Sequence, residues 1–274
     1  MSVESIKHIR GISLLDEIHT VGNSPLKVLA DDFKIYAVKN SKNKHPARDI
    51  INELFAHYFL KLWGIQTPSI SLITMNHDYL LPNLNVNHQP HFYNKEVFAS
   101  KWIDDAIEIT SIYQISNKFD YKKFHYPEVL FKIGLFDLWV ENEDRRPCNH
   151  NLILQNIEGK FHILPIDHAF IFGPRNYIDL NPCDFCASGN ESIFFTNLAL
   201  SLKKYLKKNK NWHPIDKDYF YLCLDKCKEE YRNIVANIPI TWGFTDDHSS
   251  KLYDFLFNEE RNDAVFQEYL YNIR

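Results

Sequence analysis

The sequence of 274 residues predicts an α+β fold with two lobes, a small β-rich lobe over residues 1–103 and a larger helical lobe over residues 104–274. Strand-like runs dominate the first part, and helical patterns dominate residues 190–274. A strand-turn-strand pattern at residues 151–167 is embedded in the helical part. A change in texture near residues 103–106 marks the expected boundary, and a cleft between two such lobes is a natural ligand site.

The first lobe begins with a predicted hairpin. The runs "LKVLA" at 26–30 and "FKIYAVKN" at 33–40 are apolar and β-branched, and an acidic turn separates them. The segment "ARDIINELFAHYFLKLWGI" at 47–65 has apolar residues at helical spacing, and its glycine is a typical helix end. Two further runs, "SISLITM" at 69–75 and "EVFASKWI" at 96–103, predict strands.

The second lobe begins with a largely apolar helix, "YPEVLFKIGLFDLWVEN" at 126–142, which leads into a charged loop. After the loop, "NLILQ" and "FHILPID" predict an embedded hairpin with "NIEGK" as its turn. Three long helical patterns follow: "SIFFTNLALSLKKYLKK" at 192–208, "DYFYLCLDKCKEEYRNIVANI" at 218–238 and "SKLYDFLFNEERNDAVFQEYLYNI" at 250–273.

The composition is that of a globular protein, with 45% hydrophobic and 15% aromatic residues. The 31 basic and 35 acidic side chains give a net charge of -4, so neither a nucleic-acid partner nor an anionic membrane is expected. The basic run "KKYLKKNKNWH" at 203–213 is more typical of the solvated end of a helix. The N-terminus lacks the apolar core of a signal peptide, no window has the length of a membrane span, and the cysteine count is odd. We therefore expect a cytoplasmic protein.

Acidic and amide side chains cluster around the embedded hairpin. Asp144 and Asn149 lie five residues apart in the loop after the buried helix, and Asp167 ends the second hairpin strand. If the hairpin forms, its open end brings the loop and Asp167 together. Such oxygen ligands suit Mg²⁺, and one carboxylate remains to accept a proton. Taken singly, each residue is better explained as the cap of a turn or a helix, and the ordered set is what favours a site.

A lysine and a glutamate in the first lobe form a second candidate pair. Strand alternation places Lys39 on the same face as Ile35 and Ala37, and Glu53 lies on an apolar face of the next helix. An inward lysine needs a partner or an anion. The two residues therefore predict an ion pair that holds the lysine against a phosphate, although a lone lysine or glutamate often reaches solvent instead.

In this order, "YAVK", the helical glutamate, "DRRPCNHNLIL" and "LPIDHAF" resemble the protein-kinase-like superfold, and most closely the HipA-like kinases. The loop also resembles the DRHxxN segment of phosphatidylinositol kinases, with "IDH" where those have Asp-Phe-Gly. The resemblance covers roughly residues 20–175. It implies ATP- and Mg²⁺-dependent phosphoryl transfer in a bilobed kinase-like fold.

The resemblance also implies roles for individual residues. Lys39 would contact the α and β phosphates, and Glu53 would orient it. Asp144 would act as the base that accepts the proton of the substrate hydroxyl group, and Asn149 and Asp167 would hold Mg²⁺. The adenine would bind to the backbone at Lys101, Trp102 and Ile103.

The chain departs from the family pattern in two places. The phosphate loop is reduced to "TVGNSPLKV", so Gly22, Asn23, Ser24 and their N–H groups would contact the phosphates. Ser24 also lies where relatives autophosphorylate, which suggests self-inhibition as a side hypothesis. Arg146 replaces the histidine of phosphatidylinositol kinases. It or Arg145 could neutralise phosphate charge, and a structural salt bridge to Glu141 or Glu143 is at least as plausible.

The resemblance favours a kinase that acts on a serine or threonine of an unidentified protein. One alternative is a degenerate kinase that serves as a nucleotide-binding or scaffold module, and its support is the glycine-poor loop. Another is a lipid or small-molecule kinase, but the sequence shows no basic, apolar-tipped membrane face. The chain begins only about 20 residues before the phosphate loop, so we expect no extra N-terminal subdomain like that of HipA toxins and carry over no growth-arrest role. No residue pattern indicates a partner antitoxin.

The cysteines allow one further reading. Cys183, Cys186, Cys223 and Cys227 could in principle form a zinc site. The spacing of Cys223 and Cys227 along a helix is commoner in packing than in metal binding, so packing is the simpler interpretation.

Overall fold

The computed structural model describes residues 3–19, 24–76, 88–185, 191–208 and 212–274. The chain forms two compact units, and each is considered on its own. The first unit comprises Met1–Tyr58, Pro68–Asp104 and Arg232–Thr245, and the second comprises Phe59–Thr67, Asp105–Tyr231 and Asp246–Arg274. The first unit therefore includes a late stretch that the sequence assigned to the helical lobe. The division into domains at residue 103 stays a prediction.

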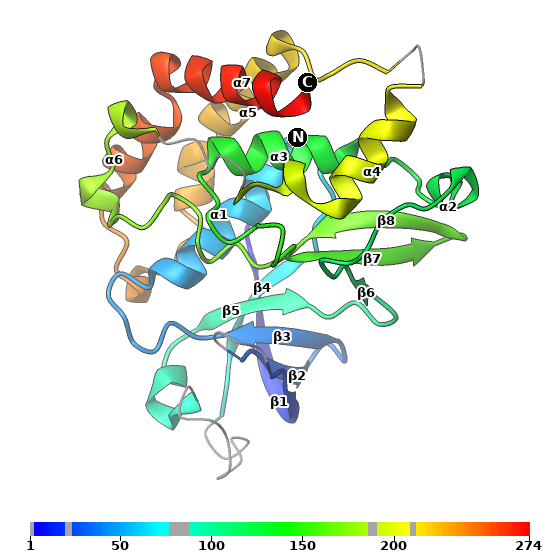
Figure 1. Ribbon diagram of the computed structural model, residues 1–274. Coiled ribbons are helices and arrows are strands. Elements are labelled where there is room, and N and C mark those ends of the chain that lie inside the picture. The colour runs from blue at the N-terminus through cyan, green and yellow to red at the C-terminus, as the bar shows by residue number, and fades with distance from the viewer. Residues whose placement is uncertain (1–2, 20–23, 77–87, 186–190, 209–211) are drawn as a thin grey trace. The chain divides into compact units, whose positions relative to one another are not determined.

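The first unit is built on a closed five-stranded barrel with the strand order β1-β2-β3-β5-β4 (Figure 1). Neighbouring strands are antiparallel except for β1 and β4, which are parallel. The strands are β1 (Lys7–Glu17), β2 (Leu26–Ala30), β3 (Ile35–Lys39), β4 (Ile70–Thr74) and β5 (Val97–Lys101). Short 3-10 turns follow at η3 (Pro90–Tyr93) and η8 (Ile240–Trp242). The predicted hairpin and the two later strands are present.

The barrel interior explains which strands could be predicted. Val28 and Val38 are fully buried, and Tyr36 is nearly so, which matches the alternation in β2 and β3. Strand β1 was not predicted, because Ile9 and Gly11 are the only residues along its eleven that are buried. A strand that pairs on both edges and contributes little to the core leaves a weak hydrophobic pattern.

Helix α1 (Arg48–Leu62) is almost entirely buried from Ile50 to Leu60, so its sequence is apolar on most sides. Gly64 follows it with a φ of +67°, the left-handed conformation that glycine adopts most easily. The Gly64 N–H donates to the Lys61 carbonyl at 2.9 Å, and the Ile65 N–H donates to the Leu60 carbonyl at 2.8 Å. The predicted helix and its glycine end are confirmed.

The second unit holds a three-stranded sheet with the order β6-β7-β8 and most of the helices. Its elements are β6 (Ile107–Glu108), α2 (Lys118–Lys122), α3 (Val129–Trp139), β7 (Leu152–Ile157), β8 (Lys160–Pro165), η4 (Tyr177–Asp179), η5 (Pro182–Asp184), η7 (Ile193–Phe195), α4 (Asn197–Leu206), α5 (Lys217–Val235), α6 (Asp246–Leu256) and α7 (Glu259–Ile273). The last four residues of α5 belong to the first unit. The pattern predicted as one helix over 250–273 is two helices, because the side chain of Asn258 caps α7 by accepting the Arg261 N–H at 2.9 Å.

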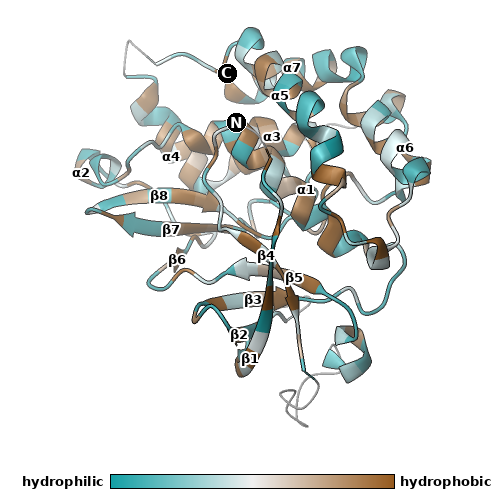
Figure 2. Cartoon of the chain, turned by 180° about the vertical axis from the view of Figure 1, so that it is seen from behind, coloured by the Kyte–Doolittle hydropathy of each residue, from teal (hydrophilic) through white to brown (hydrophobic). Residues whose placement is uncertain are grey.

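Helix α3 and the β7–β8 hairpin form the frame of the second unit. All but two of the eleven residues of α3 are buried, and the helix packs against α7 and β8. The hairpin turns at Glu158 and Gly159, both with positive φ, as a two-residue turn requires. Figure 2 shows the hairpin passing from hydrophilic colours at its turn to hydrophobic ones at its open end, in agreement with the burial along β8. None of the helices that the structure describes combines the length and apolar character of a transmembrane span.

A close contact in this frame yields a stability prediction. A Cβ atom added at Gly134 in α3 would lie 2.4 Å from Cζ of Phe194, whose ring is fully buried. Gly134→Ala should therefore destabilise the protein by about 1–3 kcal/mol in urea unfolding, despite the better helix propensity of alanine. Phe194→Leu replaces the ring with a shorter side chain, so Gly134→Ala should lower the free energy of unfolding by less in that variant. A stabilising Gly134→Ala in the wild-type chain would contradict the contact.

Candidate functional site

The open end of the β7–β8 hairpin brings the charged loop and Asp167 together. Leu152 pairs with Pro165 in the antiparallel register, and the Ile166 N–H donates to the Asn151 carbonyl at 3.0 Å. Asp167 is the next residue along the chain. The convergence that the sequence predicted from the hairpin is therefore present in the second unit.

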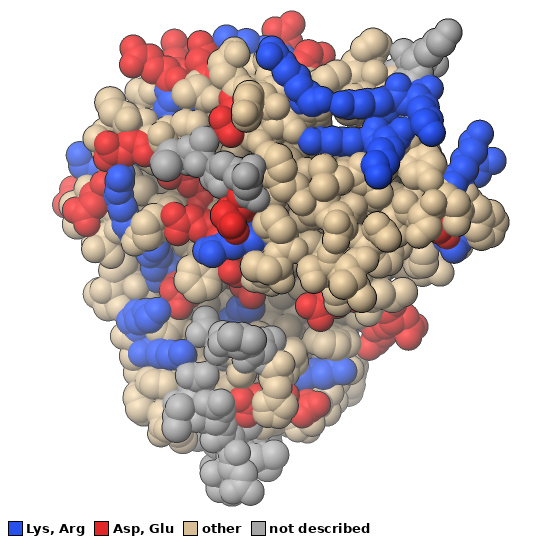
Figure 3. All heavy atoms as spheres, in the orientation of Figure 1, with Lys and Arg blue, Asp and Glu red and all other residues tan. Residues whose placement is uncertain are grey.

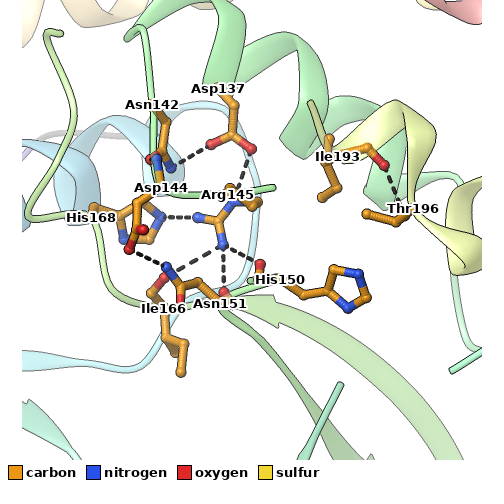
Figure 4. A network of polar contacts seen from close by, with 10 residues as sticks. All are labelled: Asp137, Asn142, Asp144, Arg145, His150, Asn151, Ile166, His168, Ile193 and Thr196. Atoms are coloured by element: carbon orange, nitrogen blue, oxygen red, sulfur yellow. Dashed lines mark hydrogen bonds and ion pairs between the residues drawn. The ribbon is translucent and has the colours of Figure 1, made fainter. Parts of the chain in front are cut away.

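The carboxylate of Asp144 is held by an amide that sequence reasoning missed. Nδ2 of Asn151 donates to Oδ2 of Asp144 at 2.9 Å, and the Asp144 N–H donates to Oδ1 of Asn142 at 3.2 Å (Figure 4). Asp144 is half-buried, so the carboxylate is fixed on one side and still reaches solvent. The available signal was the position of Asn151 directly before the apolar strand.

Asn149, the predicted metal ligand, lies in a tight turn within the loop. Its N–H and carbonyl exchange hydrogen bonds with the carbonyl and N–H of Arg146, at 3.1 and 2.8 Å. Its side chain is half-buried. The loop thus offers two amides, Asn149 and Asn151, where the sequence reasoning selected one. The metal role of Asn149 stays a prediction.

Asp167 has a φ of +55°, in the left-handed region that is uncommon for residues other than glycine. The segment after it is joined to the loop through the backbone. The Phe172 N–H donates to the Val140 carbonyl at 2.5 Å, and the Gly173 N–H donates to the Glu141 carbonyl at 3.2 Å. Strained backbone of this kind persists where the surrounding structure determines it, and it is often found at functional sites.

Arg145 is the hub of this part of the molecule. Its side chain is almost completely buried, with 1% of the residue exposed. The guanidinium contacts Asp137 (Nε to Oδ2, 2.8 Å), the carbonyls of His150 (3.1 Å), Asn151 and Ile166 (3.5 Å), and Nε2 of His168 (2.8 Å), as Figure 4 shows. The guanidinium therefore ties α3, the loop and the segment around Asp167 to one another.

The two arginines of the loop differ in their contacts, and only the alternative of a glutamate partner for Arg145 was wrong. Arg145 pairs with Asp137 of α3 rather than with Glu141 or Glu143, and its burial assigns it to structure rather than to a phosphate. Arg146 is exposed, and its Nε donates to the Glu143 main-chain carbonyl. The sequence could not identify Asp137, because an acid inside an apolar helix has the same pattern whether it is paired or not.

Two buried carboxyl groups near the loop have altered proton affinities. Burial raises the pKa of Asp137, and the charge of Arg145 opposes that rise. Burial also raises the pKa of Glu141, opposed by Arg261, whose Nη2 lies 2.9 Å from Oε1. Each acid is buried together with a positive partner, and removing that partner would leave an uncompensated charge.

In the first unit, Nζ of Lys39 lies 2.5 Å from Oε1 of Glu53. The side chains are only 13% and 6% exposed, so the pair is buried. Lys39 lies on the face of β3 opposite the barrel core, which contains Tyr36 and Val38. The predicted ion pair is thus present. Contact of Lys39 with a phosphate stays a prediction.

The predicted phosphate loop is described in part. Gly22 and Asn23 lie outside the described residues. Ser24 is 3% exposed and has a positive φ of 45°, and its carbonyl lies 2.7 Å from Nε2 of His88. Nδ1 of His88 contacts the Tyr93 hydroxyl at 2.6 Å. The burial of Ser24 does not favour direct phosphate contact or phosphorylation of its hydroxyl group in this conformation.

In the segment predicted to bind adenine, most of the backbone N–H groups already donate hydrogen bonds within the first unit. The Lys101 N–H donates to the Ser69 carbonyl and the Trp102 N–H to the Ile35 carbonyl, both at 2.8 Å. Nζ of Lys27 lies 4.3 Å from the centre of the Trp102 ring. Two of the three N–H groups in this segment are therefore satisfied, because β5 lies between β3 and β4. Adenine binding to the backbone of this segment stays a prediction. Among the described residues the N–H of Ile103 has no such partner, so it is the donor still available.

The zinc alternative finds no support. Cys183 is exposed, whereas Cys223 and Cys227 are buried in α5, and Cys186 lies outside the described residues. The described part of the chain contains no group of three or more His, Cys, Asp or Glu side chains that could hold a metal ion. Cys223 and Cys227 belong to the packing of the second unit.

The loop and the hairpin end fit a different kind of metal site. Asp144, Asp167, Asn149 and Asn151 offer carboxylate and amide oxygens, the ligand type that Mg²⁺ prefers. Since Mg²⁺ is usually held by one or two carboxylates together with substrate phosphates, the small number of acids is compatible with a metal that arrives with a nucleotide.

The comparisons with known proteins agree with this arrangement. The family model described as HipA-like kinase matches residues 14–188, which is more than half of the chain. The chain belongs to the HipA-like kinase family. A search of curated protein sequences gave no significant match.

Similar solved structures include the Helicobacter pylori proinflammatory kinase CtkA, with 14% sequence identity and a TM-score of 0.58 over 98% of this chain and 99% of that one. The Golgi casein kinase with Mn and ADP bound gives 12% identity and a TM-score of 0.47 over 99% and 74% of the two chains. A second structure of the Golgi casein kinase gives 11% identity and 0.43 over 97% and 74%. At such identities the similarity to CtkA shows the fold alone. The predicted kinase-like fold is confirmed.

Removing the buried guanidinium should destabilise the second unit. Arg145→Ala leaves Asp137 as a buried charge without its cationic partner, so the free energy of unfolding measured in urea should fall by about 3–5 kcal/mol. The matched control is the neighbouring exposed arginine, since Arg146→Ala should change stability by less than about 0.5 kcal/mol. If Arg145→Ala does not fold, Arg145→Lys serves as the milder variant. If the Arg145→Ala and Arg146→Ala variants were equally stable, the structural role assigned to Arg145 would be contradicted.

Buried histidines should make the protein sensitive to acid. Burial lowers the pKa of His88 and of His150 below the ordinary value of about 6.5, so the unfolded state binds protons first as the pH falls. The stability that they contribute is fully present above about pH 6.5 and is lost as the pH falls through the lower folded-state pKa values. Urea unfolding between about pH 7.5 and 5 should show this loss. A His150→Gln variant with the wild-type pH slope would contradict the assignment of His150.

Proposed function

We propose that the protein transfers the γ-phosphoryl group of ATP, with Mg²⁺, to a serine or threonine hydroxyl group of a protein substrate. The observation that carries the proposal is the position of Asp144, held by Asn151 at the hairpin end that leads into Asp167. Membership of the HipA-like kinase family supports phosphoryl transfer as the chemistry. The identity of the acceptor rests on the family resemblance alone.

In this proposal Asp144 is the general base. Its carboxylate is half-buried and keeps one oxygen that Asn151 does not use. In the proposed reaction the acceptor oxygen bonds to the γ phosphorus, the bond to the ADP oxygen breaks, and the acceptor proton passes to Asp144. Arg145, directly beside it, fixes the loop through buried contacts.

The remaining roles follow the same proposal. Asp167 and an amide, Asn149 or Asn151, would hold the Mg²⁺ ion, whose chemistry is to neutralise phosphate charge. Lys39, oriented by its buried ion pair with Glu53, would bind phosphate oxygens.

Two alternatives stay open. A degenerate kinase that binds nucleotide without transferring phosphate is favoured by the burial of Ser24 and by the sheet's use of the Lys101 and Trp102 N–H groups. A lipid or small-molecule hydroxyl group could replace the protein acceptor, because the chemistry at Asp144 would be the same.

Replacing the base should separate binding from catalysis. Asp144→Asn should lower transfer of ³²P from labelled ATP to a general protein acceptor such as casein by about a hundredfold or more, because the proton loses its acceptor. Stabilisation by Mg·ATP in a thermal melt should be retained. The matched control is Lys226→Ala on the exposed side of α5, which should leave both readouts unchanged.

The same two readouts discriminate the alternatives. Stabilisation by Mg·ATP without transfer to casein, to the chain itself or to phosphatidylinositol vesicles would favour the binding module. Transfer that persists in Asp144→Asn would refute the role of that residue. A wild-type protein that Mg·ATP does not stabilise would contradict the kinase and the module together.

A further inference from the structure

The outer face of helix α2 is basic with an apolar tip. Lys118, Lys122 and Lys123 are exposed, and Phe119 is 72% exposed between them. Residues 118 and 122 are four apart, as are 119 and 123, so the four side chains share one side of the helix. Nζ of Lys123 lies 5.0 Å from the centre of the Phe119 ring.

Helix α4 has a similar outer face. Its buried side is formed by residues such as Leu198, Leu202 and Leu206, while Leu200 is 43% exposed and Lys204 is exposed. Leu200 and Lys204 are four residues apart and therefore lie on the same side. Lys207 and Lys208 follow the helix directly and are also exposed.

Contacts within the second unit hold the two faces together. The rings of Tyr121 and Tyr205 stack with their centres 5.5 Å apart, which joins α2 to α4. Nδ2 of Asn197 donates to the Ser111 carbonyl at 2.8 Å, so Ile112, which is 82% exposed, lies beside the start of α4. Figure 3 shows the resulting group of basic side chains at the upper right of the molecule, over α4 and α2 of Figure 1.

We define the lysine face by its members: Lys118, Lys122, Lys123, Lys204, Lys207 and Lys208, with Ile112, Phe119 and Leu200 as its apolar residues. Its positive charge is poorly compensated. Asp120 pairs with Lys123 at 3.1 Å, and Lys207 donates to the Arg274 carbonyl at 2.6 Å. Within the described residues Lys118, Lys122 and Lys204 form no ion pair. In a chain with a net charge of -4, such a concentration of one sign cannot follow from composition.

We propose that the lysine face binds peripherally to the surface of an anionic lipid bilayer. Lysines near such a surface attract it by charge, and exposed Phe, Leu and Ile side chains can insert at the boundary between headgroups and acyl chains. The expectation of no membrane partner came from the net charge and from the run at 203–213 read alone. The fold brings residues 203–208 of that run beside residues 118–123, which the sequence order separates from them.

A nucleic acid and an acidic polypeptide fit the lysine face less well than a lipid bilayer does. Its cations are all lysines, which are point charges without the planar fork that favours bidentate binding of single phosphates or carboxylates. Nucleic-acid surfaces commonly use several free aromatic rings to stack on successive bases, whereas the lysine face as defined has the single exposed ring of Phe119, and Tyr121 and Tyr205 stack on each other. Exposed Ile112, Phe119 and Leu200 have no use against a purely charged partner.

Vesicle sedimentation without nucleotide tests the proposal on the full chain. Binding to phosphatidylcholine vesicles that contain phosphatidylglycerol should exceed binding to phosphatidylcholine alone, and it should weaken between about 50 and 200 mM salt. The charge reversal K122E/K204E should lower the partition coefficient at least about tenfold. Phe119→Ser should lower it with a smaller change in salt dependence. The matched control K226E/K228E, at two exposed lysines of α5, should bind like the wild type.

Several results would overturn the proposal: no binding to the anionic vesicles at low salt, equal binding to neutral vesicles, or no effect of K122E/K204E. Tighter binding of duplex DNA or polyglutamate than of the vesicles at matched charge and salt would assign the face to one of those partners instead. Because the assay contains no ATP and Asp144→Asn should bind vesicles normally, its failure is distinct from failure of the proposed kinase activity.

Discussion

The geometry of the candidate site depends on the buried guanidinium of Arg145. It pairs with Asp137 of α3 and donates to carbonyls on both sides of the hairpin end, so one side chain joins the helix, the loop and the strands. A planar group with several donors is suited to this task, because a single charge would leave some of these carbonyls unsatisfied. Asp144 and Asn151 are positioned by their chain neighbours within this arrangement. The side chains of the candidate site therefore need few contacts of their own.

The sequence predicted the elements whose patterns are local. The hairpin that delivers Asp167 could be predicted because alternation and a Gly-containing turn lie within a few residues. The Lys39–Glu53 pair could be predicted because each residue interrupts an apolar face. Pairings over longer distances, such as Arg261 with Glu141, leave no trace in spacing. Asn151 was missed because the spacing from Asp144 pointed to Asn149, and its place before the apolar strand did not show that it binds Asp144, which the hydrogen bond does.

The two units divide the proposed chemistry. The first holds a buried ion pair on a barrel, and the second holds acids and amides at the end of a hairpin. Family membership and the kinase-like fold give these features a common interpretation. The lysine face lies in the second unit, and the argument for it does not depend on the ion pair or on the acids of the hairpin end. Its lysines come from two separate stretches of an acidic chain, and a surface of this kind can be recognised only after folding.

The central proposal is that the loop and hairpin end of the second unit hold a metal-bound nucleotide. A crystal structure with Mg²⁺ and a non-hydrolysable ATP analogue tests it most directly. The account predicts that Asp167 and either Asn149 or Asn151 are ligands of the metal ion. It also predicts that Nζ of Lys39 contacts a phosphate oxygen and that the carboxylate of Asp144 faces the γ phosphate. A nucleotide bound elsewhere, or a metal without Asp167 among its ligands, would contradict the account.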